Sequence, residues 1–69
     1  MAISYKKLWK LLIDRDMKKK DLIALSGISQ SSVTKMGKNE NANTDVLVRI
    51  GKALKCDIVD IAEIVLEEN

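Results

Sequence analysis

A short polar segment carries the side chains of this chain that are best suited to recognising another molecule. Between positions 29 and 35, six residues offer hydroxyl, amide or ammonium groups: Ser29, Gln30, Ser31, Ser32, Thr34 and Lys35. Glutamine can form two hydrogen bonds to an adenine edge, serine and threonine can contact bases or phosphates, and lysine can reach guanine or a phosphate. If the segment is helical, Val33 and Met36 form one apolar side that anchors it, and the polar side chains stay free.

The residues needed for catalysis or for metal binding are scarce. The chain has no histidine and a single cysteine, Cys56, which excludes a histidine base, a zinc finger and an intramolecular disulfide. It offers no nucleophile–base pair and no glycine-rich phosphate loop. Asp57 and Asp60 are spaced like a helix cap rather than a pair of catalytic carboxylates. We therefore expect no enzymatic activity, no catalytic residue, no metal site and no cofactor.

The length and composition predict one small domain covering residues 1–69. Hydrophobic residues make up 46% of the 69 residues and aromatic residues 3%, so the expected core is aliphatic. A lone cysteine without a signal peptide indicates a reducing cytoplasm. No apolar run approaches the roughly 20 residues of a membrane span. We expect no membrane association and no second domain that could hold a small-molecule effector.

Positive charge is concentrated in the first half of the chain. Residues 1–38 contain nine lysines and arginines against three acidic residues, whereas residues 39–69 contain three against seven. A basic half indicates a face turned toward a polyanion. The alternative is a chance asymmetry between solvated helix faces, and the run Lys18, Lys19 and Lys20 could belong to such a face.

Capping residues and apolar spacing predict five helices. Four are expected at about 5–15, 19–26, 30–36 and 44–55, and the fifth begins after Asp57. Gly51 lies inside the fourth, where a glycine costs about 1 kcal/mol, so we expect a close contact with another helix there. The fifth is apolar on nearly every side, which predicts a second apolar face that meets another subunit.

The second and third predicted helices form a helix-turn-helix pattern at about residues 19–36. Two short helices joined by a tight turn that contains glycine define this motif. Leu22 and Ile23 would bury the first helix, Gly27 would permit the turn and Ile28 would fill the corner. In such motifs the N-terminal residues of the second helix meet base edges in the major groove.

Three stretches of the chain resemble the Cro/C1-type helix-turn-helix regulators, also called the XRE family: S-G-I-S, V-T-K-M and L-V-R-I-G-K-A-L-K-C-D-I. The resemblance covers about residues 5–65, and the chain is also similar to small regulators of this type encoded with antibiotic-resistance clusters. It departs from the family pattern at Ile23, where many members have alanine, and at Lys18, where serine or threonine usually caps the helix.

The resemblance implies an all-α, five-helix, lambda-repressor-like domain that binds pseudo-palindromic operators in double-stranded DNA as a homodimer. By position, the base-contacting residues would be Ser29, Gln30, Ser31, Thr34 and Lys35. Lys18, Lys19 and Lys38 would contact the phosphate backbone. The fifth helix would supply the dimer interface through Ile64, Val65 and Leu66.

The expected function is that of a sequence-specific transcriptional regulator, most simply a repressor. A protein-interaction module such as an antitoxin or anti-activator, built on the same scaffold, is the alternative. The apolar fifth helix and the acidic second half motivate that alternative.

Overall fold

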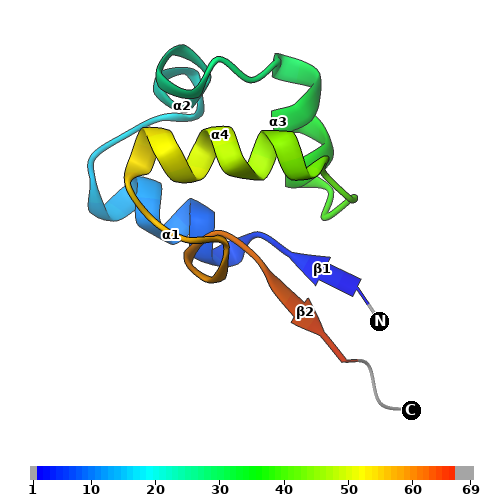
Figure 1. The fold of residues 1–69 in the computed structure, drawn as a ribbon. Coiled ribbons are helices and arrows are strands. Elements are labelled where there is room, and N and C mark those ends of the chain that lie inside the picture. Colours follow the sequence, from blue (N-terminus) through cyan, green and yellow to red (C-terminus); the bar gives the residue numbers. More distant parts are fainter. Residues whose placement is uncertain (1, 67–69) are drawn as a thin grey trace.

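Residues 2–66, which the computed structural model describes, form four α-helices, one 3-10 turn and two short strands (Figure 1). In chain order they are β1 (Ala2–Ser4), α1 (Lys6–Asp14), α2 (Lys19–Ser26), α3 (Gln30–Gly37), α4 (Thr44–Leu54), η1 (Ile58–Asp60) and β2 (Glu63–Val65). The four α-helices match the first four predicted helices in order and, within two residues, in extent. None of the helices in this part of the chain is long and apolar enough to cross a membrane.

Local hydrogen bonds explain where α2 and α3 begin and end. The Ser29 hydroxyl accepts a hydrogen bond from the Ser32 N–H at 3.2 Å and caps α3. Gly27 ends α2 in the left-handed conformation, with φ of +76°. At the start of α2, Lys18 is a weak cap, but the Asp21 carboxylate accepts a hydrogen bond from its N–H at 2.9 Å. Asp21 thus compensates directly for the weak cap at Lys18.

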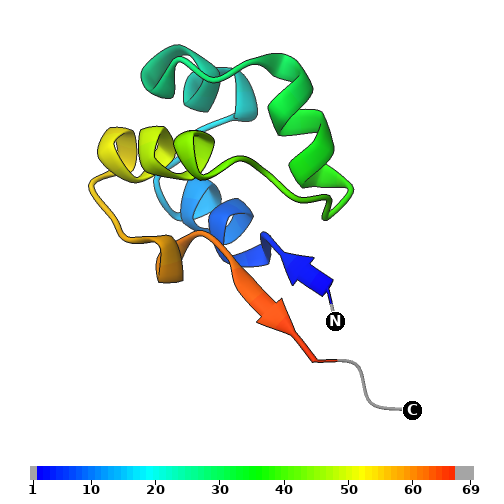
Figure 2. The same ribbon diagram turned by 45° about the vertical axis from the view of Figure 1, so that its right-hand side comes forward.

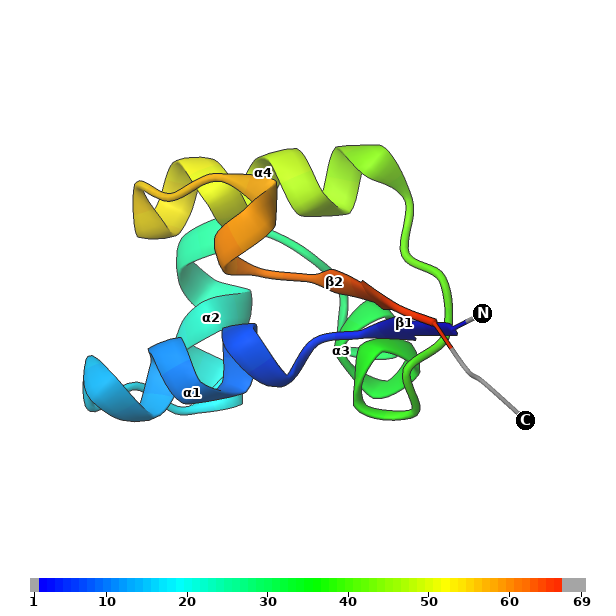
Figure 3. The same ribbon diagram turned by 90° about the horizontal axis from the view of Figure 1, so that it is seen from below.

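The prediction of a fifth helix is wrong. The expected cap does form, because the Ile58 N–H donates to the Asp57 carboxylate and the Asp57 N–H donates to the Asp60 carboxylate at 3.1 Å. The cap starts only the short η1 turn, and the chain then extends into β2, which lies beside β1 (Figure 3). The two strands pair antiparallel, and Ile3 faces Ile64. Isoleucine and valine dominate this segment, and such β-branched residues favour strands.

The hydrophobic core collects side chains from every α-helix and from the segment between η1 and β2. α4 packs on α2, and η1 packs on both α1 and α4. The Arg15 guanidinium donates to the Leu54 carbonyl and so ties the end of α1 to the end of α4. The buried apolar residues are Tyr5, Leu8, Leu12, Leu22, Ile28, Val33, Met36, Ile50, Leu54, Ile61 and Ala62. The core thereby fixes α2 and α3 at the side of the molecule opposite the two strands (Figures 1 and 2).

Gly51 marks a close backbone approach at the end of α4. Lys55 adopts a left-handed conformation with φ of +55°, and the chain folds back so that the Cys56 N–H donates to the Gly51 carbonyl at 3.0 Å. A β-carbon on Gly51 would lie 2.9 Å from the Cys56 carbonyl oxygen. The expected close contact therefore exists, but its partner is the backbone of Cys56 rather than another helix.

We expect Gly51→Ala to lower the free energy of unfolding by about 1–2 kcal/mol. Alanine favours a helix by about 1 kcal/mol over glycine, but the clash with fixed backbone costs more than this gain. Urea denaturation measures the change. Gly37→Ala is the matched control, because a β-carbon there meets only the end of a flexible lysine side chain, at 3.9 Å. If Gly51→Ala stabilised the protein as much as or more than Gly37→Ala, the contact with Cys56 would be of no consequence.

Candidate nucleic-acid interface

The outer side of α3 is polar and uncovered, whereas its inner side is fixed in the core. Val33 and Met36 are 2% and 0% exposed, respectively. The five residues predicted to contact bases are all exposed: Ser29, Gln30, Ser31, Thr34 and Lys35. Figures 1 and 2 show α3 along one side of the molecule, with no other element over its outer face. The structure therefore presents these five side chains together on one surface.

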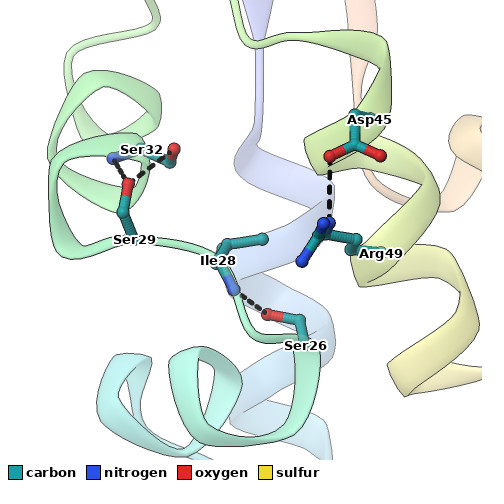
Figure 4. A network of polar contacts seen from close by, with 6 residues as sticks. All are labelled: Ser26, Ile28, Ser29, Ser32, Asp45 and Arg49. Carbon is teal, nitrogen blue, oxygen red and sulfur yellow. Dashed lines mark hydrogen bonds and ion pairs between the residues drawn. The ribbon is translucent and has the colours of Figure 1, made fainter.

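The hydroxyl groups on this surface already form hydrogen bonds within α3. The Ser29 hydroxyl lies 3.0 Å from the Ser32 hydroxyl (Figure 4) and 3.0 Å from the Ser31 hydroxyl. The Thr34 hydroxyl donates to the Gln30 carbonyl at 3.0 Å. Among residues 2–66, no side-chain hydrogen bond or ion pair engages the Gln30 amide or the Lys35 ammonium. The long side chains of Gln30 and Lys35 are therefore the donors most available to an external partner.

The three lysines predicted to contact the DNA backbone are also exposed: Lys18, Lys19 and Lys38. Lys18 and Lys19 lie at the start of α2, where free backbone N–H groups and the helix dipole favour an anion. Lys38 directly follows α3. A β-carbon on Gly37 would lie 3.9 Å from the Lys19 ammonium nitrogen, so the backbone leading to Lys38 runs close to Lys19.

The turn between α2 and α3 is held by contacts that the sequence did not reveal. The Ser26 hydroxyl donates to the Leu22 carbonyl at 2.6 Å and accepts from the Ile28 N–H at 3.4 Å. Arg49 on α4 reaches over the turn, and its Nη1 would lie 3.6 Å from a β-carbon on Gly27. Asp45 accepts from the Arg49 Nε at 2.9 Å (Figure 4). The four-residue spacing of Asp45 and Arg49 was a usable signal for that pair, but not for its position beside the turn.

Tyr5 holds the loop that follows α3, a role that its position in the sequence does not indicate. Its side chain is fully buried, and its hydroxyl donates to the Glu40 carbonyl at 2.8 Å and accepts from the Ala42 N–H at 3.1 Å. Burial raises the pKa of the Tyr5 hydroxyl, and the hydrogen bond from Ala42 opposes the shift. The sequence contains only a weak signal for this role of Tyr5: a buried tyrosine hydroxyl usually needs a hydrogen-bond partner.

Tyr5→Phe is expected to lower the free energy of unfolding by about 1 kcal/mol, because two hydrogen bonds are lost. The loss stays moderate because water can reach part of the loop and bind the backbone groups left without a partner. The raised pKa means that the folded state favours the neutral hydroxyl. The advantage of the wild type over Tyr5→Phe should therefore be complete well below pH 10 and shrink as the pH rises above about 10. Denaturation at pH 7 and above pH 10 measures both effects. An equal difference at both pH values would contradict the assignment.

The residues predicted to form a dimer interface lie on and after a strand rather than on a helix. Ile64, Val65 and Leu66 are 72%, 40% and 68% exposed, respectively. Beside them, α4, η1 and the two strands border an open groove of about 570 Å³. Its lining is mainly apolar: Ile3, Leu47, Ile58, Val59, Ala62 and Ile64, with Asp57 and Glu63. The excess apolar surface expected from the sequence is therefore present at this end of the molecule.

The fold and the exposed α3 define a helix-turn-helix protein, and residues 7–67 match the family model of the Cro/C1-type HTH DNA-binding domain. The chain belongs to this family. A crystal structure of the transcriptional regulator VanUg (form II) is similar to it, with a TM-score of 0.90 and 53% sequence identity over 96% of this chain and 88% of that chain. A comparison with curated proteins gives no match.

Proposed function

We propose that this protein is a transcriptional regulator that binds double-stranded DNA in a sequence-specific manner, most simply as a repressor. The exposed polar face of α3, anchored from beneath by Val33 and Met36, carries this proposal. A short helix of this kind, with its inner side fixed, fits the major groove and keeps a constant register on the base edges. The similarity to VanUg, which is described as a transcriptional regulator, supports the same function.

Within this interface the contacting residues divide into two groups. The first group contacts bases. In it, Gln30 and Lys35 reach base edges with donors that have no partner among residues 2–66 in the free protein. The shorter side chains of Ser29, Ser31 and Thr34 contact the bases nearest to α3. Lys18, Lys19 and Lys38 contact phosphates, which gives affinity and fixes the position of the domain on the duplex. A protein with this function would act in the cytoplasm, where the DNA is.

We further propose that the protein acts as a homodimer on a pseudo-palindromic operator. A second copy covers Ile64, Val65 and Leu66 together with the apolar groove beside them. Burial of this surface supplies the free energy of association. The two copies of α3 would then lie about one helical turn of DNA apart, roughly 34 Å.

Selection of binding sites from a randomised duplex pool, followed by sequencing, tests the proposal. We expect a two-fold symmetric motif whose half-sites are spaced by about one helical turn. Retention of DNA without any motif, lost at higher salt, would show nonspecific binding only. Failure to retain any duplex at low salt would exclude the proposed function.

The apolar surface also supports a second candidate, a protein-interaction module such as an antitoxin or anti-activator. Ile58, Val59 and Ile64 are all exposed around the groove, and a foreign protein could cover them as well as a second copy could. Sedimentation and duplex binding of the purified protein separate the two candidates. A monodisperse homodimer that binds the selected duplex contradicts the second, whereas a protein that co-purifies with a stable partner and binds no duplex contradicts the first.

A further inference from the structure

We propose that Trp9 is a positioning residue that holds the Lys19 ammonium ready for a DNA phosphate. This inference rests on the proposed DNA binding and assigns a role to a side chain outside the helix-turn-helix. The geometry points to it because the Lys19 Nζ lies 4.7 Å from the centre of the Trp9 ring. At this distance the face of a tryptophan attracts a cation.

The Lys19 ammonium sits where three helices come together. Lys19 is the first residue of α2, Trp9 belongs to α1, and Gly37 is the last residue of α3. A β-carbon on Gly37 would lie 3.9 Å from the Lys19 Nζ. The C-terminal end of a helix carries partial negative charge and attracts a cation. The Trp9 ring and the end of α3 therefore favour the same position of the ammonium.

The Trp9 contact leaves the charge of Lys19 available. The two ion pairs found among residues 2–66 join Lys7 to Glu63 and Arg49 to Asp45, so neither occupies Lys19. A carboxylate would neutralise the ammonium and compete with a phosphate, whereas an aromatic ring orients it and leaves its outer side open. Lysine has large rotamer entropy, and a side chain that is already ordered loses less of it on binding.

Lys19 differs in this respect from its neighbours. Within the described residues the cation–π contact involves Lys19 alone, although Lys18 and Lys20 are exposed as well. Trp9 itself is half-buried and packs against the edge of the core. If Trp9 had a purely structural role, replacing it would change DNA affinity equally with and without Lys19. A role in positioning Lys19 predicts an effect only when Lys19 is present.

A double-mutant cycle with Trp9→Leu and Lys19→Met tests the proposal on the selected duplex. Lys19→Met removes the charge and keeps a long, unbranched side chain. We expect it to weaken binding and to lower the salt slope by about one unit. Trp9→Leu alone should weaken binding about two- to fivefold, in line with a partly exposed cation–π contact. In the Lys19→Met background, Trp9→Leu should cause no further loss, and Trp9→Phe should retain most of the wild-type affinity.

The matched control replaces Lys20 by methionine, and its effect should multiply with that of Trp9→Leu. Independent effects of Trp9→Leu and Lys19→Met would overturn the inference, as would wild-type affinity of Lys19→Met. In either case the wild type would still select a DNA motif, and the proposed function would stand. If the wild type binds no duplex, both proposals fail together. Urea denaturation of each variant confirms that folded protein is being compared.

Fluorescence gives a second measurement that does not depend on replacing Trp9. The chain contains a single tryptophan, so its emission reports on the surroundings of Trp9 alone, and comparison with Lys19→Met isolates the part that comes from Lys19. Saturating DNA should change the emission of the wild type, because a phosphate that binds the Lys19 ammonium alters the charge next to the Trp9 ring. The change should be absent or much smaller in Lys19→Met and retained in Lys20→Met. An equal change in Lys19→Met and the wild type would overturn the inference.

Discussion

Gln30→Ala is expected to weaken binding to the selected duplex by about 1–3 kcal/mol and to relax the base preference at one position of each half-site. The amide of Gln30 can donate and accept at once, so it can pair with both N6 and N7 of an adenine. In the free protein this amide has no hydrogen-bond partner among residues 2–66. Alanine removes both bonds and leaves the polar edge of the base without its partner.

Binding to three duplexes measures this effect: the selected site, the site with the affected base pair changed, and a scrambled site. The wild type should distinguish the first two, and Gln30→Ala should bind both alike. Ser31→Ala is the control, because the Ser31 hydroxyl already lies 3.0 Å from that of Ser29 and should contribute less. An equal loss for Gln30→Ala on selected and scrambled DNA would mean that Gln30 contributes nothing to base recognition.

Ile64→Asp is expected to abolish the homodimer and to reduce affinity for the full operator by about 10²- to 10⁴-fold. Ile64 is 72% exposed, so the fold of a single copy tolerates the change. A carboxylate buried between two copies would lose its hydration without a partner. When the copies no longer associate, the second half-site adds little to the binding of the first, and the gain from linked binding is lost.

Sedimentation equilibrium and operator binding measure these two effects on the same samples. Ile13→Asp provides a matched control, because Ile13 on α1 is 75% exposed and does not border the groove. It should leave the oligomeric state unchanged. A wild type that stays monomeric at high concentration and on DNA would exclude the proposed dimer. A dimer that survives Ile64→Asp would place its interface elsewhere.

The parts of the fold that depend on local signals could be predicted from the sequence. Ser29 and Gly27 fixed the adjoining ends of two helices through their own hydrogen bonds and conformation. The C-terminal segment failed because its structure depends on a distant partner. The cap at Asp57 was correctly identified, but the cap alone does not decide how far a helix continues. The pairing of Ile64 with Ile3 decides it, and this contact leaves no periodic signal in the sequence.

The candidate site could be predicted in outline for the same reason. The three-residue spacing of Val33 and Met36 was enough to determine which face of α3 is buried. The support of that face could not be predicted, because it comes from residues far away in the chain. Arg49 reaches the α2–α3 turn from α4, and Tyr5 reaches the following loop from the N-terminus. Such contacts depend on tertiary packing rather than on residue spacing.

The hydroxyls of Ser29, Ser31 and Ser32 cluster around one point at the start of α3. A hydroxyl that already has a partner gains little by exchanging it for a base, so each of these contacts carries a small energetic difference between bases. The information content of a half-site should then be concentrated at the base pairs under Gln30 and Lys35. At the neighbouring base pairs, operators in the genome could then differ from one another with little loss of affinity. A homodimer that reads two half-sites would recover the sequence specificity that a single half-site lacks.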